Sequence, residues 1–122
     1  MQRVIFDSSF LMAVVEFPTT WYEDITDALG KFQPVLLQCV ARELERISSG
    51  QGRRARYASL ALTLASEFQV EECGGVGVDE EIVSKALTLT AAAATADREL
   101  LRSLRSSGVR VIGLRGGRVA LL

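Results

Sequence analysis

Short apolar segments alternate with amphipathic stretches along the whole chain, and this alternation is the strongest constraint on its fold. Six segments have the length and composition of buried strands: residues 3–6, 34–37, 68–70, 92–95, 109–112 and 118–122. Most of the stretches between them have helical periodicity. Strands that alternate with helices favour an α/β fold, a three-layer α/β/α domain with a mainly parallel central sheet. The last segment follows the turn pair Gly116 and Gly117, so it can form an antiparallel edge.

The composition is that of an ordinary soluble domain, with 48% hydrophobic and 24% charged residues. Its 122 residues suffice for one domain, residues 1–122. No apolar run approaches the roughly 20 residues of a membrane span, so we expect no membrane partner. The first residues lead directly into a strand, which predicts a cytoplasmic protein without a secretory signal. Cys39 and Cys73 are too few for a disulfide framework, and we expect two buried, reduced thiols.

The chain contains no histidine, which narrows its chemistry. Catalysis by Ser-His-Asp or Cys-His groups and any zinc site with a histidine ligand are excluded. Acid, base and ligand roles must therefore fall to carboxylates, hydroxyls and arginines. Hard oxygen ligands suit Mg²⁺ or Mn²⁺.

Four acidic residues stand where strands end or where the next helix begins. Asp7 follows the first strand and Asp97 follows the strand 92–95. Glu43 and Asp79 lie in the first turns of helical segments, and their 100° steps direct them toward apolar sides. Ligands of parallel sheets collect at the carboxyl ends of strands, so we expect the four carboxylates to meet at one edge. There they would repel one another and need a divalent cation to stay ionised.

Simpler explanations exist for each acid alone. Asp79 and Asp97 stand at helix starts, where an aspartate caps the backbone and suits the helix dipole. Glu43 could pair with an arginine at the solvent edge. The same helical geometry directs Glu81 and Glu99 toward water.

Hydroxyls and arginines accompany the acids. Thr95 and Ser8 or Ser9 are placed to orient metal-bound water by hydrogen bonding. All but two of the 14 basic residues are arginines, which bind phosphates better than lysines do. Candidates for contacts with RNA are Arg53, Arg54 and Arg56, which form a cluster, and Arg98 beside Asp97, although helical geometry directs Arg98 outward. Arg46 is expected on the side of its helix away from Glu43. The alternative for the arginines is a solvated face.

Four motifs in series resemble the PIN domain family. They are Asp7-Ser8-Ser9-x-Leu11, the segment PxxxQCVARELERI with Glu43, the segment VDEEIVSKAL with Asp79, and Thr95-x-Asp97-x-x-Leu100 followed by GVRVI. Together they cover almost the whole chain in the expected order. The short form is most similar to archaeal PIN proteins near the Fcf1 ribosome-processing group and to VapC-type toxins. Ala96 departs from the pattern, since many members carry Asn there, which concerns the fine positioning of the last acid.

The resemblance implies a Mg²⁺- or Mn²⁺-dependent endoribonuclease that cuts RNA and is commonly a homodimer. Its acidic quartet maps onto Asp7, Glu43, Asp79 and Asp97, with Thr95 and Ser8 or Ser9 in support. Glu80 and Glu99 are neighbouring acids that some members recruit. An antitoxin protein or a ribosome precursor would be the further partner.

Two other classes of protein share parts of this pattern. A phosphoacceptor receiver domain needs paired acids after the first strand and a lysine after a late strand, whereas Asp7 stands alone and neither Lys31 nor Lys85 is so placed. A catalytically silent PIN-like module that binds RNA or supports an assembly is the stronger rival. Such modules normally lack one of the acids, and this chain keeps all four.

Overall fold

A six-stranded sheet in the order β3-β2-β1-β4-β5-β6 runs through the molecule. The structure is a computed structural model that describes residues 1–122. The elements are β1 (Gln2–Phe6), α1 (Ser8–Glu16), α2 (Trp21–Leu29), β2 (Phe32–Leu37), α3 (Gln38–Ser48), α4 (Gly52–Leu64), β3 (Gln69–Glu71), α5 (Val78–Thr88), β4 (Ala92–Ala94), α6 (Arg98–Ser106), β5 (Val111–Arg115) and β6 (Arg118–Leu121). All neighbouring strands are parallel except β5 and β6. The predicted α/β class and the antiparallel last strand are confirmed.

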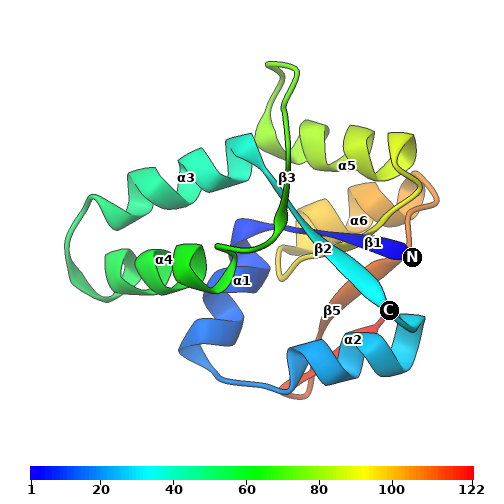
Figure 1. The fold of residues 1–122 in the computed structure, drawn as a ribbon, viewed down its shortest axis with the longest axis horizontal. Coiled ribbons are helices and arrows are strands. Elements are labelled where there is room, and N and C mark those ends of the chain that lie inside the picture. The colour runs from blue at the N-terminus through cyan, green and yellow to red at the C-terminus, as the bar shows by residue number, and fades with distance from the viewer.

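Five of the six helices form two groups (Figure 1), and α2 packs against β6 and β2. Helices α1, α3 and α4 pack against one another, and α5 packs against α6. The chain steps from β1 to β2 and β3 in one direction, then crosses back to β4 and continues to β5. Right-handed crossovers place the helices of these two series on opposite faces of the sheet. The result is the three-layer arrangement that the alternating pattern predicts.

Apolar residues of the strands and of the helix sides that face them form the core. Val4, Ile5 and Phe6 of β1 are fully buried, and so are all three residues of β4. Trp21 packs edge-on against Phe6, with ring centroids 5.5 Å apart. The aromatic residues at the start of α2 therefore serve packing, since Tyr22 also contacts the ring of Phe32.

Each strand differs from its predicted bounds by one to three residues at one end or both. Strand β2 begins at Phe32, so Pro34 lies inside it rather than at its first position. Strand β3 pairs with β2 only from Val35 onward, so one side of Pro34 is a sheet edge, where proline is tolerated. Strand β5 begins at Val111, two residues later than predicted.

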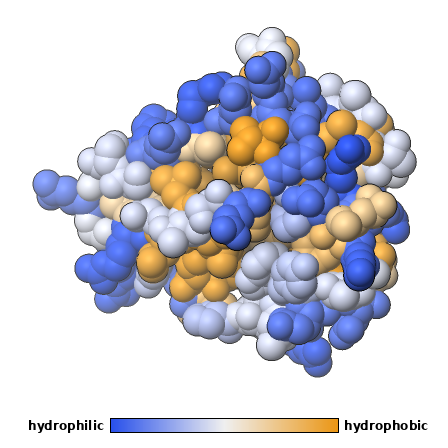
Figure 2. Space-filling view, viewed as in Figure 1, coloured by the Kyte–Doolittle hydropathy of each residue, from blue (hydrophilic) through white to orange (hydrophobic).

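Strand β3 is the outer edge of the sheet on the side opposite β6. Figure 2 has the same view as Figure 1, in which β2 and β3 lie in front, and it shows apolar areas among hydrophilic ones on this face. Exposed large apolar side chains include Val70 of β3 and Leu60 of α4. The three-residue length of β3 limits the edge that it offers to a further strand.

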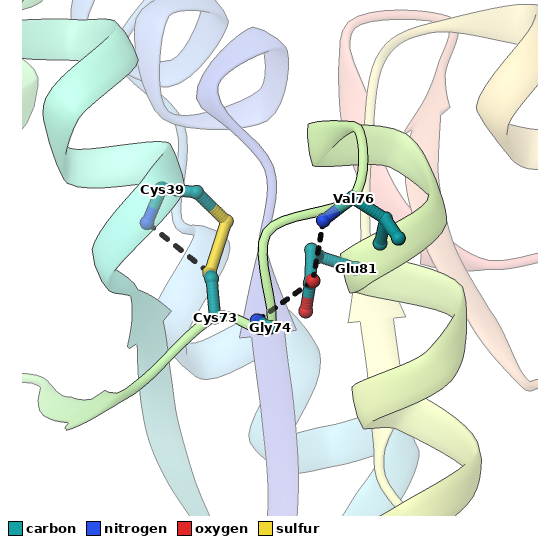
Figure 3. Close-up of a disulfide and its surroundings, with 5 residues drawn as sticks. All are labelled: Cys39, Cys73, Gly74, Val76 and Glu81. Atoms are coloured by element: carbon teal, nitrogen blue, oxygen red, sulfur yellow. Dashed lines mark hydrogen bonds between the residues drawn. A yellow bond between two sulfur atoms is a disulfide. The ribbon is translucent and has the colours of Figure 1, made fainter.

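Cys39 and Cys73 form a disulfide, so the prediction of two reduced thiols is wrong (Figure 3). The parallel register explains why residues 34 apart in sequence meet. Leu37 at the end of β2 pairs with Glu71 at the end of β3, and each cysteine follows its strand by two residues. The two Cα atoms are 6.1 Å apart, and the backbone N–H of Cys39 donates to Cys73 Sγ at 3.2 Å. The bridge ties the start of α3 to the loop that leads into α5.

No helix here combines the length and the apolar character that a membrane span requires.

Candidate functional site

Strand ends bring two of the predicted acids together. Strands β1 and β4 are neighbours at the point from which the chain builds the sheet outward in both directions. Asp7 directly follows β1, and its backbone N–H donates to the carbonyl of Ala94 at 2.9 Å. Thr95 and Asp97 follow β4 at the same edge. This switch point at the carboxyl ends of parallel strands is where α/β sheets bind ligands.

A hollow of about 250 Å³ lies at this edge, and all four predicted acids line it. We call it the acidic hollow. It is lined by Asp7, Ser8, Ser9, Met12, Glu43, Arg46, Ile47, Arg54, Asp79 and Asp97. The acids come from the end of β1, the second turn of α3, the first turn of α5 and the residue before α6. Segments far apart in the sequence thus contribute carboxylates to one place.

Asp7 is the buried member of the set, with 4% of its surface exposed. Its Oδ2 accepts hydrogen bonds from Ser9 Oγ at 2.5 Å and from Thr95 Oγ1 at 2.9 Å. Burial raises the pKa of Asp7 above its ordinary value, and the nearby charge of Glu43 adds to this, while the two hydroxyl bonds oppose it. The two hydroxyls therefore hold the Asp7 carboxylate in place, but no cationic side chain pairs with it.

The predicted hydroxyls bind carboxylates directly. Ser8 Oγ donates to Glu43 Oε1 at 2.6 Å, which links α1 to α3 across the acidic hollow. Thr95 Oγ1 also accepts from the backbone N–H of Asp97 at 3.0 Å, and Ser9 Oγ accepts from that of Ala96 at 3.0 Å. The first turn of α1 and the segment after β4 are thereby joined around Asp7.

Asp79 lies close enough to the other acids of the hollow to be repelled by their charges. Its pKa is raised, first by desolvation and then by the charges of Asp7, Asp97, Glu43 and Glu99. Its helix neighbours Ile82 and Ala86 are buried, as predicted, whereas Asp79 itself is exposed at the rim. It makes no capping bond, because the cap position of α5 is Gly77. The capping explanation therefore does not hold for Asp79.

Asp97 does cap its helix. Asp97 Oδ1 accepts from the backbone N–H groups of Glu99 at 2.8 Å and Leu100 at 3.2 Å. The capping explanation is thus correct for Asp97. The same side chain also lines the acidic hollow. Glu99 was predicted to point to water. It is exposed, but its charge lies near enough to raise the pKa of Asp79.

No arginine pairs with any of the four acids. The one ion pair in the structure joins Arg118 to Asp24, at 3.8 Å. Grouped carboxylates without a positively charged partner favour a bound cation, and carboxylate oxygens are the ligands that Mg²⁺ and Mn²⁺ prefer. No group of three acids is arranged so that it could hold an ion as it stands. The donor set nevertheless fits Mg²⁺, which takes few carboxylates directly and keeps several waters.

The arginines divide between different surfaces. Arg54 lines the acidic hollow, and Arg53 and Arg54 line a groove beside it. Arg98 lines another hollow with Thr95 and Asp97, and Arg56 lines none.

Arg46 also lines the acidic hollow, so its predicted placement away from Glu43 is wrong. It stands three residues after Glu43, and helical residues three apart are neighbours, which is the signal that identifies it.

Glu81 is buried rather than directed at water, so its predicted orientation is also wrong. The loop after Cys73 folds back over the first turn of α5 (Figure 3). Glu81 Oε1 accepts from the backbone N–H groups of Gly74 at 2.7 Å and Val76 at 3.3 Å. A helical wheel contains no information about a loop that covers the helix. Glu81 thus fixes the segment that precedes Asp79.

Comparisons with known proteins agree with this architecture. The family model for the PIN-like domain matches residues 4–117. The structure of the PIN domain endonuclease Utp24 is 23% identical, with a TM-score of 0.78, and the alignment covers 98% of this chain and 90% of that one. A domain of a functionally unknown protein from Methanocaldococcus jannaschii is 17% identical, with a TM-score of 0.70 and coverage of 95% and 93%.

VapBC-1 from nontypeable Haemophilus influenzae is 14% identical, with a TM-score of 0.66, over 90% of this chain and 96% of that one. At such identities the structural likeness shows a shared fold. No curated protein matches the chain in sequence. The match to the family model covers nearly the whole chain, from the first strand to the turn before the last one. The chain therefore belongs to the PIN-like domain family.

Proposed function

We propose that the chain is a Mg²⁺- or Mn²⁺-dependent endoribonuclease that hydrolyses RNA phosphodiester bonds. The observation that carries the proposal is the set of four carboxylates that line one hollow at the switch point of a PIN-like sheet without an arginine partner. The raised pKa values of Asp7 and Asp79 agree with carboxylates that no arginine pairs with. The proposed ligands and catalytic residues are Asp7, Glu43, Asp79 and Asp97.

A divalent cation at this site would activate water and neutralise charge that develops on the phosphodiester. The side chains around the hollow position its carboxylates. Ser9 and Thr95 hold Asp7 Oδ2, and Ser8 holds Glu43, so two of the carboxylates have a fixed orientation. Rigid ligands of this kind reduce the reorganisation that binding a cation requires.

The arginines of the hollow would hold the substrate. Arg46 and Arg54 line it without forming ion pairs, so their guanidinium groups are free for phosphate oxygens. Arginine presents two parallel N–H donors to a phosphate. Arg46 comes from α3 and Arg54 from α4, and together they favour an RNA backbone that crosses the hollow between these helices.

Metal titration and RNA cleavage test the proposal together. Mn²⁺ should raise the melting temperature of the wild type, and an unstructured RNA should be cut in Mn²⁺ but not in excess chelator. Asp7→Asn should abolish both effects while the domain stays folded. Asp27→Asn, which removes an exposed carboxylate in α2 away from the hollow, is the matched control and should behave as the wild type.

A silent PIN-like module that binds RNA or supports an assembly is the second candidate. The observation that favours it is that no three acids are arranged to hold an ion as they stand. If Mn²⁺ gives neither cleavage nor thermal stabilisation of the wild type, this second function replaces the first.

The cellular role follows from the partner. We propose either processing of a ribosome precursor or the activity of a VapC-type toxin, both from the resemblance of the motifs. A small antitoxin encoded beside this chain, and its co-purification with the chain, would identify the toxin role. We also propose a homodimer, and light scattering on the purified protein should give twice the mass of 13.3 kDa.

A further inference from the structure

A groove between α1 and α4 opens beside the acidic hollow. We call it the α1/α4 groove. It has a volume of about 450 Å³, within the range of ligand sites. Ser9, Met12 and Glu16 line one wall at helical spacing along α1, and Arg53, Arg54 and Tyr57 line the other along α4. Ser9, Met12 and Arg54 line the acidic hollow as well, so the two cavities are continuous.

The groove has the chemistry of a nucleotide site. Arg53 and Arg54 are exposed and form no ion pair, so both can receive a phosphate. Tyr57 is half-buried, pairs with none of the other aromatic rings and makes no side-chain hydrogen bond. An aromatic ring beside cationic groups is the arrangement with which proteins bind single-stranded nucleic acid, the ring for a base and the cations for the backbone.

The residues at the two ends of the groove limit the length of RNA that it can hold. At one end Ser9 Oγ donates to Asp7 Oδ2, so the groove begins at the proposed catalytic carboxylate. At the other end stands Glu16, seven residues and about 10 Å further along α1. Glu16 is the only acid that lines the groove, and its charge would repel a continuing phosphate chain. The groove therefore has room for a short segment next to the hollow.

We infer that the α1/α4 groove binds the nucleotide adjacent to the scissile phosphate of a single-stranded RNA, with its base on Tyr57 and its phosphate on Arg53 and Arg54. This inference rests on the proposed function for its choice of ligand. It adds a requirement that the acids alone do not impose, because a base held in a duplex cannot stack on a side chain. The site selects unpaired RNA.

Binding in excess chelator tests the inference apart from catalysis. The probe is a fluorescent, unstructured RNA oligonucleotide whose anisotropy is measured with the full chain. Arg53→Gln should weaken binding about 10-fold. It should also lower the dependence of log affinity on log salt by about 0.7, the contribution of one phosphate contact to a single strand. Arg102→Gln removes the same charge from an exposed position of α6 that lines neither the groove nor the acidic hollow, and its affinity should stay within about two-fold of the wild type.

Tyr57 supplies the second arm. Tyr57→Leu should weaken binding by about 5- to 150-fold, which corresponds to the loss of one stacked base. Tyr57→Phe keeps the ring and should restore the affinity. A fully paired duplex of the same sequence should compete poorly with the single strand.

Equal affinities of the Arg53→Gln and Arg102→Gln proteins, or equal affinities of the Leu and Phe variants of Tyr57, would overturn the inference. So would a duplex that competes as well as the single strand. These results are distinct from a failure of the proposed function. In that case Mn²⁺ would give no cleavage, yet binding in chelator would still depend on Arg53 and Tyr57.

Discussion

Loss of the Cys39–Cys73 bridge should destabilise the domain by a predictable amount. The bridge closes a loop between residues 34 apart in sequence. The chain-entropy relation for a loop of this length gives about 4 kcal/mol of stabilisation through the unfolded state. For a domain of this size, 1 kcal/mol corresponds to about 4 °C in melting temperature, so the expected loss is about 15 °C. Because small domains are stable by only about 5–15 kcal/mol, this is a large share of the total.

The measurement is thermal and denaturant unfolding, followed by circular dichroism, with and without a reductant. The wild type should melt lower in the reductant. The double variant with Cys39→Ser and Cys73→Ser should melt at that lower temperature in both conditions, which separates the bridge from other effects of the reductant. If the denatured wild type exposes two free thiols without reductant, or melts at one temperature in both conditions, the reasoning from the bridge is refuted.

The bridge also bears on the acidic hollow. Cys39 lies one helical turn before Glu43 in α3, and Cys73 begins the loop that leads to Asp79. Without the covalent link these two carboxylates should be less well placed relative to each other. Mn²⁺ should then stabilise the reduced protein less than the oxidised one, when each is measured against its own metal-free state.

Three further outcomes follow from the site. In chelator, unfolding free energy should fall as pH rises above 3.8, because the raised pKa values of Asp7 and Asp79 make the folded state bind more protons than the unfolded chain; Asp7→Asn should flatten this slope in a series of denaturation curves, and a slope of opposite sign would contradict the burial argument. Asp97→Ala should lose about 1 kcal/mol of stability with its two capping bonds while Asp97→Asn keeps it, and both should lose the Mn²⁺-induced shift in melting temperature. Glu81→Ala should cost about 2 kcal/mol in equilibrium denaturation, against less than about 0.5 kcal/mol for the exposed Glu80→Ala, and equal values would show that the bonds to the loop contribute nothing.

The sequence was informative where local pattern and chain topology act together. Asp7 and Asp97 each follow a short apolar strand, and the rule for parallel sheets then brings them to one edge without knowledge of any side-chain contact. The same reasoning extended to Glu43 and Asp79 through helical geometry. All four acids line the acidic hollow.

Long-range register and the packing of loops were beyond the sequence. The disulfide follows from the pairing of Leu37 with Glu71, and no local pattern fixes which residues of two parallel strands lie opposite each other. Glu81 is buried by a loop whose path depends on glycine conformation, since Gly75 has a φ of +94°. The periodicity of one segment therefore identifies neither the loop that covers a helix nor the register of two paired strands.

The central strand β4 consists of alanines alone, and all three are fully buried. A methyl group is therefore the only kind of side chain that β4 presents to the helices on either face of the sheet. Any bulkier residue there must push a layer outward, and overpacking of this kind costs about 1–3 kcal/mol. The carbonyl of Ala94 accepts a hydrogen bond from the backbone N–H of Asp7, so such a shift would also displace the buried carboxylate of Asp7. Residues that carry no charge and touch no ligand thus set the spacing on which the acidic chemistry depends.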